Sequence, residues 1–492
     1  MASLRYLAAL VATVLVAAAC SASVPIQLAD PAVATSSVAP AEPAPTESRA
    51  NPTGGPGPTP SLAPSPAIAP SPGSDGLDDP YYPQLGNGGY DVRRYVLDLD
   101  WDPVTASLSG TTSIEATATQ SLSSFNLDFL GMEIDNISVD DSVAGFSRNA
   151  AELTVEPSQP IADGAEFVVN VTYAGQPQRV PQLSDVDIGG WYVENGTAFV
   201  VSEPAGSFSW HPVNDHPSDK ALFRVEITAP NELTVASAGV LIDTIDEGDG
   251  TSTWIYEPRD PIAPYLLPLA IGDLVLVDGG TVDGVIIRNA VVADLADRID
   301  AFDRTPDMIR VFSQLFGPYP FEAYGVLVVD STLGVALEQQ TMSLFGQDFL
   351  SQGGDFDDVI AHELAHQWFG NHVALNQWDD IWLNEGFATY AQYLYFEAID
   401  PGYDIDAQIA LLTQFDPAIL STPVPGDPGP DALFAPSVYF RGALTVHSLR
   451  RTLGDDAFFE TLRTYIERFG GANATTEDLR AVAEEVSNLN LE

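Results

Sequence analysis

Hydrophobic and polar residues follow two different periods along the chain. Between residues 90 and 289, short runs of alternating apolar and polar residues are separated by Gly, Asn, Asp and Pro, which is typical of β-strands joined by turns. After residue 290 the apolar positions recur every three to four residues, which predicts helices. The β pattern is clearest at 95–99, 112–118, 166–173, 222–229 and 284–287, and the helical pattern at 293–316, at 442–453 and around His362 and Glu385.

This order of elements predicts an α+β multidomain protein. We expect an N-terminal domain of antiparallel β-sheet over residues 81–289, followed by a mainly helical domain over residues 290–492. A chain of 492 residues is long enough to bury at least two hydrophobic cores. The sequence contains no internal repeat.

The first twenty residues have a different composition. Arg5, an apolar run at 6–16 and a stretch of small residues precede Cys20, which is the pattern of a secretory signal. Cys20 is the only cysteine, and its place resembles the lipobox of bacterial lipoproteins, in which that cysteine is lipidated and becomes the mature N-terminus. That motif prefers Leu where Ala17 stands. We therefore expect an extracytoplasmic, lipid-anchored protein, with secretion after cleavage near Ala19 or Ala22 as the alternative.

Residues 21–80 are dominated by Pro, Ala and Ser. Such a segment cannot bury enough apolar surface to fold, so we expect a disordered tether between the anchor and the folded domains. An unanchored disordered leader is the alternative.

The charge balance of the chain indicates which classes of ligand its surface can bind. The chain has 69 acidic and 19 basic residues and a formal net charge of −50, and Lys220 is its single lysine. Repulsion disfavours nucleic acid and anionic lipid as ligands of the protein surface, so we expect membrane contact only through Cys20. The same field can steer cationic peptides toward the protein. Nothing in the composition assigns an oligomeric state.

The strongest chemical signal is the motif His362-Glu363-x-x-His366, followed 19 residues later by Glu385. Positions i and i+4 of a helix share one face, so both imidazoles can reach one metal ion, with Glu363 beside it. Two imidazoles and a carboxylate form the ligand set of a catalytic zinc that keeps a fourth position for water. We expect one Zn²⁺ per chain, with Asp380 as a possible hydrogen-bond acceptor for a ligand imidazole.

Four stretches together resemble the gluzincin zinc aminopeptidases of the aminopeptidase N family. The run 380–388 around Glu385 matches the second zinc motif, and 335–339 around Glu338 stands where the family carries its G-A-M-E-N exopeptidase motif. The segments 202–217, which begins with Ser202-Glu203, and 437–443 around Tyr439 match the amine pocket and the catalytic-tyrosine region. The resemblance covers residues from about 90 to 490.

The resemblance implies a saddle-like β domain followed by a thermolysin-like peptidase domain. It implies that His362, His366 and Glu385 bind zinc, that Glu363 is the general base and that Tyr439 stabilises the oxyanion. Glu338 and Glu203 would bind the α-ammonium of a peptide with a free N-terminus. Two carboxylates that hold a cation at a fixed distance from zinc would confine cleavage to the first peptide bond.

The sequence also departs from the family pattern. Val335, Leu337 and Gln339 replace Gly, Met and Asn of the exopeptidase motif, and Val201 stands where many members have Gln. The chain ends soon after Tyr439, so we expect a short form without the large C-terminal helical domain of full-length members and with a more open site.

Several rival interpretations remain at this stage. Glu338 and Glu203 could be ordinary acidic residues, and Tyr439 could be a buried core tyrosine. A broader zinc endopeptidase would not need the two glutamates, and an epoxide hydrolase activity is known in a branch of the family. A non-catalytic peptide-binding lipoprotein is the rival from another class, although such proteins usually lose a metal ligand or the base.

Overall fold

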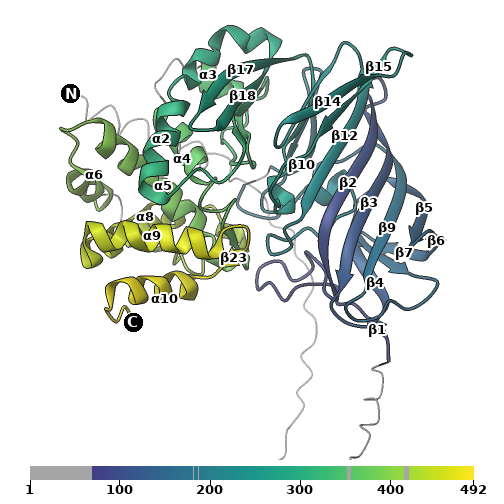
Figure 1. The fold of residues 1–492 in the computed structure, drawn as a ribbon, viewed down its shortest axis with the longest axis horizontal. Helices are drawn as coiled ribbons and strands as arrows, with labels where there is room; N and C mark the ends of the chain where they lie inside the picture. The colour runs from purple at the N-terminus through teal and green to yellow at the C-terminus, as the bar shows by residue number, and fades with distance from the viewer. Residues whose placement is uncertain (1–68, 181, 187, 352–355, 415–419) are drawn as a thin grey trace, which may run out of the picture.

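The structure is a computed structural model that describes residues 69–180, 182–186, 188–351, 356–414 and 420–492. The expected signal segment, Cys20 and most of the expected tether lie outside these residues. Figure 1 shows a sheet-rich part formed by the first half of the chain, beside a helical part formed by the second half. This is the α+β architecture that the two hydrophobic periods predict.

The first part consists almost entirely of strands. They are β1 (Ser71–Pro72), β2 (Tyr90–Asp102), β3 (Ser107–Ala118), β4 (Leu122–Asp128), β5 (Glu133–Val139), β6 (Ser142–Val143), β7 (Gly145–Asn149), β8 (Glu152–Glu156), β9 (Glu166–Gly175), β10 (Gly190–Glu194), β11 (Thr197–Val201), β12 (Leu222–Pro230), β13 (Thr234–Ser237), β14 (Leu241–Asp246), β15 (Thr251–Tyr256) and β16 (Leu269–Gly272). They form an eight-stranded sheet in the order β14-β15-β12-β2-β3-β9-β5-β6 and two four-stranded sheets, β1-β4-β8-β7 and β10-β11-β16-β13.

Alternation of side chains explains the large sheet. In β2, Tyr95, Leu97 and Leu99 are buried while Val96 and Asp98 between them are partly or fully exposed, because successive side chains of a strand point to opposite faces. Most pairs in this sheet are antiparallel, as expected. The interior pair β2–β12 is parallel, with Tyr95 opposite Phe223, because a long connection carries the chain back before β12 begins.

Residues 69–80, which the sequence placed in the tether, contact the folded part. Strand β1 pairs with β4, and Asp79 is buried. The Asp79 carboxylate accepts hydrogen bonds from the backbone N–H groups of Tyr81, Tyr82 and Trp378. These contacts stabilise a segment whose composition alone predicts no fold: β1 pairs through backbone groups, and the Asp79 side chain satisfies three backbone N–H groups.

The second part begins with a sheet and continues with helices. Its elements are β17 (Leu274–Val282), β18 (Val285–Val292), β19 (Ala323–Tyr324), β20 (Val326–Val329), β21 (Ser343–Gly346), β22 (Ala374–Leu375), β23 (Asn473–Ala474), α2 (Thr305–Phe316), α3 (Gln347–Ser351), α4 (Asp357–Ala365), α5 (Trp382–Ile399), α6 (Ile405–Leu412), α8 (Pro436–Leu453), α9 (Asp455–Phe469) and α10 (Thr476–Ser487). Strands β17, β18, β20 and β21 form one sheet in that order, and β19 also pairs with β18. Residues 274–292 therefore pair with strands that follow residue 320.

The single helix expected over 293–316 is divided in two. Residues Ala293–Phe302 form a 3₁₀ helix, and α2 begins only at Thr305. Pro306 stands in the first turn of α2. Proline lacks the N–H that a continuous α-helix requires, so it favours the start of a helix and disrupts its interior.

Helices α4, α5 and α8 form the framework of the site. Gly386 of α5 and Gly442 of α8 lie so close that a Cβ atom on Gly386 would come 2.8 Å from the Cα of Gly442. A larger residue at either position would separate the helices. This contact brings the first turn of α8, which carries Tyr439, against the first turn of α5, which carries Glu385.

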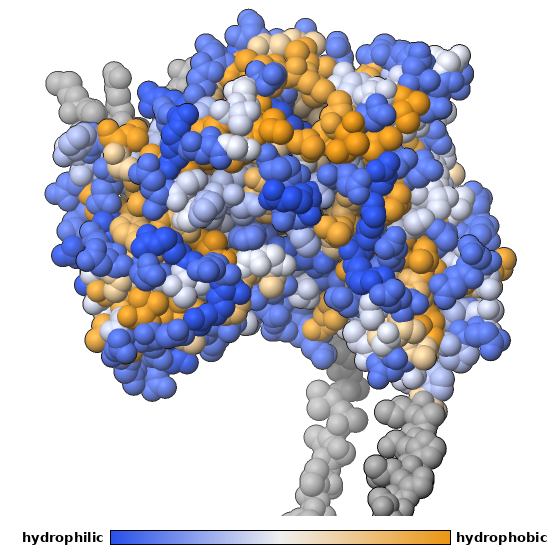
Figure 2. Space-filling view, viewed as in Figure 1, coloured by the Kyte–Doolittle hydropathy of each residue, from blue (hydrophilic) through white to orange (hydrophobic). Residues whose placement is uncertain are grey.

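The surface is largely hydrophilic, in line with the acidic composition (Figure 2). Exposed apolar side chains occur on the edge strands β14 and β17, at Leu241, Ile242, Ile245, Val275 and Leu276. Figure 2 shows hydrophobic colour gathered along the upper edge, where Figure 1 places these strands. Within the described residues, no helix combines the length and the apolar character needed to cross a bilayer.

Candidate active site

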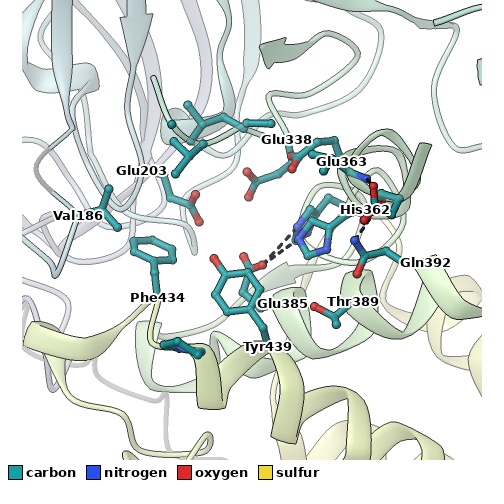
Figure 3. A pocket seen from close by; sticks show the side chains of 18 of the residues that line it. Val186, Glu203, Glu338, His362, Glu363, Glu385, Thr389, Gln392, Phe434 and Tyr439 are labelled. Carbon is teal, nitrogen blue, oxygen red and sulfur yellow. Dashed lines mark hydrogen bonds and ion pairs between the residues drawn. The ribbon is translucent and has the colours of Figure 1, made fainter. Parts of the chain in front are cut away.

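The predicted metal ligands meet between two helices. His362 and His366 extend from α4 and its C-terminal end, and Glu385 extends from the first turn of α5. The Oε2 atom of Glu385 lies 3.1 Å from Nε2 of His362 and 3.6 Å from Nε2 of His366 (Figure 3). All three side chains are nearly or fully buried. The structure therefore brings together the three residues that the sequence motif selected.

The geometry fits a zinc ion. Ligand atoms at about 2.0–2.1 Å from a tetrahedral zinc lie about 3.3 Å from one another, and the two measured distances bracket this value. The ring of His366 donates from Nδ1 to the backbone oxygen of Phe369 at 3.1 Å, which leaves Nε2 free for a metal. The His362 ring is hydrogen-bonded by the side chain of Gln392. Both imidazoles are thus oriented as metal ligands.

The charge of Glu385 also suits a metal. Burial acts to raise its pKa, but the neighbouring imidazoles of His366 and His362 outweigh burial and lower the pKa to about 2. Glu385 is therefore an anion at neutral pH, as a ligand carboxylate must be.

Glu363 lies beside the metal ligands and lines the same pocket. Its side chain is buried. Burial raises the pKa of Glu363 well above its ordinary value; His366 opposes this shift, and the carboxylates of Glu338 and Glu385 add to it. A carboxylate with raised proton affinity next to a metal site is suited to accept a proton from water.

A second cluster consists of the carboxylates of Glu203, Glu338 and Glu385, whose ligand atoms all lie within 4.8 Å of one another. Glu203 and Glu338 are buried, and the Oε1 atom of each has no hydrogen-bond partner among the described residues. Burial, and then repulsion by Glu338, raises the pKa of Glu203 well above its usual range. Such a cluster is destabilised unless a cation with several N–H donors completes it.

The turn that follows α4 holds the Glu338 segment in place. Gln367, next to the ligand His366, donates from Nε2 to the Glu338 carbonyl at 3.1 Å, and Asn371 donates to the same oxygen at 2.6 Å. The Gln367 Oε1 atom accepts from the backbone N–H of Thr341 at 2.9 Å. The distance between Glu338 and the predicted metal ligands is therefore fixed by side chains of one short segment.

The Glu203 segment is held by buried carboxylates of the β domain. Asp215 accepts hydrogen bonds from the backbone N–H groups of Gly206 and Phe208, and Asp128 accepts one from the N–H of Asp215. The neighbouring His211 is fully buried and contacts the carbonyl of Pro212, as expected for a structural residue. These bonds satisfy a loop that has little regular secondary structure.

Tyr439 stacks against the metal site. Its ring lies 5.9 Å from the His362 ring, centroid to centroid, with an angle of 18° between the planes. Burial, followed by the nearby carboxylates of Glu385 and Glu203, raises the pKa of Tyr439 well above its ordinary value. The hydroxyl therefore stays protonated and can donate a hydrogen bond within the pocket.

Some residues act otherwise than the sequence indicated. Asp380 accepts hydrogen bonds from Thr476, and the partners of the two imidazoles are Gln392 and the Phe369 carbonyl. Sequence reasoning missed Gln392, which lies seven residues after Glu385 and therefore on the same face of α5. Val201 is fully buried and does not line the pocket.

Comparison with known proteins places this geometry in a family. Residues 91–266 match the peptidase M1 N-terminal domain, and residues 300–492 match the peptidase family M1 domain. The crystal structure of the M1 zinc metallopeptidase from Deinococcus radiodurans superposes with a TM-score of 0.77 at 32% identity, covering 84% of this chain and 93% of that one. The chain belongs to peptidase family M1. A single catalytic zinc is the cofactor that the M1 family and its solved structures indicate.

Curated M1 relatives give the same assignment at lower identity. Rice Aminopeptidase M1-A is 27% identical over 81% of this chain and 48% of its own length. Human endoplasmic reticulum aminopeptidase 1 is 25% identical over 79% of this chain and 45% of its own length. This M1 chain thus spans about half the length of these relatives. A variant of the Deinococcus enzyme, 32% identical over 84% of this chain and 96% of its own, was solved with a Tyr-Ser-Ala substrate.

Proposed function

We propose that the chain is a zinc aminopeptidase that hydrolyses the first peptide bond of peptides with a free N-terminus. The observation that carries this proposal is the position of the Glu203 and Glu338 carboxylates, within 4.8 Å of the metal-ligand atom of Glu385. An α-ammonium is a cation with three N–H donors, and it would complete this buried acidic cluster. The carbonyl of the first residue would then lie next to the metal site, so only the first peptide bond could react.

The remaining residues account for the chemistry. His362, His366 and Glu385 would hold the zinc, which supplies polarisation of the scissile carbonyl and a lowered pKa for water. Glu363 would accept the proton of the attacking water and deliver it to the departing amine. The Tyr439 hydroxyl would donate a hydrogen bond to the carbonyl oxygen as its negative charge develops.

The relatives support the same reaction. Curated matches are named aminopeptidases, and Deinococcus M1 structures at 32% identity include one with a Tyr-Ser-Ala substrate. Other M1 structures at the same identity hold L-arginine and L-tryptophan, which are free amino acids. The decisive experiment compares leucyl peptides with free and with N-acetylated termini. We expect cleavage of the free form only, and equal cleavage of both would contradict the proposal.

Replacing Glu338 by Gln should weaken binding of the α-ammonium group of the peptide. One charge-assisted hydrogen bond contributes about 1.5–3 kcal/mol, so we expect kcat/KM for free peptides to fall by about ten- to a hundredfold. Steady-state kinetics on leucyl-alanyl-alanine measures the loss. Glu133→Gln, at an exposed position of β5, is the matched control and should leave the rate unchanged. An unchanged rate for Glu338→Gln would exclude the proposed amine contact.

Tyr439→Phe removes a single hydroxyl. If that hydroxyl stabilises the developing oxyanion, kcat should fall by about 10²–10³-fold while KM changes little. Tyr393→Phe, which removes a buried hydroxyl that does not line the pocket, is the control. A mainly structural role for Tyr439 would instead lower the melting temperature of the variant and leave kcat close to that of the wild type.

A further inference from the structure

Lys220, the single lysine of the chain, connects the two domains. It belongs to the β domain and stands two residues before strand β12. Its Nζ atom donates hydrogen bonds to the backbone carbonyls of Asn371 at 2.7 Å and of His372 at 3.1 Å. Both carbonyls belong to the turn that follows α4 in the helical domain. Lys220 therefore ties the β domain to the end of the helix that carries the predicted zinc ligands.

The surroundings of the Lys220 amine are unusual for a lysine. Burial lowers the pKa of Lys220 to about 7, and the charge of Asp260 opposes this shift. Burial, followed by the charge of Lys220, lowers the pKa of His372 to about 4, so that ring is neutral at neutral pH. The charged and the neutral form of an amine both carry N–H donors, so the two bonds to the turn persist on either side of neutral pH.

The turn transmits the position of Lys220 to Glu338. The backbone carbonyl of Asn371 accepts from Lys220, while the Asn371 side chain donates from Nδ2 to the Glu338 carbonyl at 2.6 Å. Gln367, in the same turn, donates to the same Glu338 oxygen at 3.1 Å. A shift of the turn would therefore move the backbone of Glu338, and the carboxylate would move with it.

The position of that carboxylate is demanding because the amine cluster is formed by both domains. Glu203 comes from the β domain and Glu338 from the helical domain, and Figure 3 shows their carboxylates facing one another. Their ligand atoms lie within 4.8 Å of each other and of Glu385. A small ammonium group can contact all of them only if the two domains keep this spacing.

We propose that Lys220 is a positioning residue for the amine site. It would hold the turn after α4, and through Asn371 the Glu338 carboxylate, at the distance from Glu203 that binding of an α-ammonium requires. This proposal rests on the aminopeptidase function proposed above. The described residues that line the pocket do not include Lys220, so its effect on the peptide is indirect.

The experiment replaces Lys220 by Met, which keeps the length of the stem and removes the N–H donors. We expect KM for leucyl-alanyl-alanine to rise about tenfold, while kcat and zinc content stay within about twofold of the wild type. The loss falls on KM because Lys220 acts on the residues that bind the ammonium. Lys220→Arg should restore part of the affinity, since a guanidinium also donates to two carbonyls.

A double-mutant cycle separates positioning from general stabilisation. Glu338→Ala removes the carboxylate on which Lys220 would act, so adding Lys220→Met to this variant should raise KM no further. A merely structural role would raise KM by the same factor in both backgrounds. That result, or an unchanged KM in Lys220→Met alone, would overturn the proposal.

A second variant tests the next link, so the proposal does not depend on the folding of Lys220→Met. Asn371→Ala should raise KM in the same way and should show the same lack of effect beside Glu338→Ala, and a wild-type KM in Asn371→Ala would also overturn the proposal. Arg94→Met is the matched control, because Arg94 pairs at 2.8 Å with Glu257 of its own domain, and this variant should keep the wild-type KM. Failure of the wild type to cleave free peptides would instead refute the aminopeptidase function.

Discussion

Replacing Glu363 by Gln is expected to lower kcat by about 10⁴-fold without loss of zinc. Gln has the same shape as Glu but cannot accept a proton at neutral pH, so the attacking water keeps its proton and the departing amine receives none. The proposed metal ligands are His362, His366 and Glu385, and the contacts among them do not involve the Glu363 carboxylate. Kinetics on a leucyl reporter and metal analysis of the purified variant measure the two quantities.

The stability of the same variant provides the control. Glu363 is buried near the carboxylates of Glu338 and Glu385, which, after burial itself, raise its pKa. A neutral amide relieves that repulsion, so the melting temperature should be equal to or above that of the wild type. A variant that loses zinc or unfolds would show that Glu363 is a structural residue, and one that retains a tenth of the activity would show that it is not the base.

Removal of zinc is expected to abolish activity, and added zinc should restore it. The second test of the metal site is Glu385→Gln, which replaces the anionic ligand by a neutral one and should reduce both zinc content and kcat/KM by at least about 10²-fold. Isothermal titration with zinc and the melting temperature with and without zinc provide readouts that do not depend on activity. A ligand at a hundred times its Kd raises stability by about 2.7 kcal/mol, which is easily detected.

The control for the metal site is another acidic residue of the pocket. Glu203 belongs to the carboxylate cluster that would bind the α-ammonium, and it is not a metal ligand in the proposed assignment. The variant Glu203→Gln should therefore keep the zinc-dependent rise in melting temperature. If Glu385→Gln binds zinc as tightly as the wild type, Glu385 is not a ligand. If chelation leaves the activity intact, the hydrolysis does not depend on the metal.

Local sequence patterns predicted which strands and helices form better than they predicted where each one begins and ends. All five alternating runs fall within or overlap strands, because alternation reflects a sheet with one buried face. The helix expected from residue 442 starts at Pro436, so that Tyr439 lies on its first turn. The helix expected over 293–316 is interrupted before Pro306, because a local signal overrides the apolar period.

The spacing of the sequence predicts the arrangement of some functional residues, whereas the roles of others depend on long-range packing. His362, Glu363 and His366 could be placed relative to one another from their spacing, since one helical turn fixes their geometry. The roles of Gln367 and Asn371, which both bind the Glu338 carbonyl, depend on a loop that lies about thirty residues earlier in the sequence. No periodicity of the sequence predicts such contacts, because they arise only when the loop packs on the turn that follows α4.

The sequence by itself determined the metal-binding chemistry, since the ligand types and their helical spacing are local properties. Only the tertiary structure decided what that chemistry can act on. It brings Glu203 from the β domain within 4.8 Å of Glu338 and Glu385. These distances depend on the packing of two domains and on the close approach of Gly386 and Gly442, which long-range contacts set and local sequence does not.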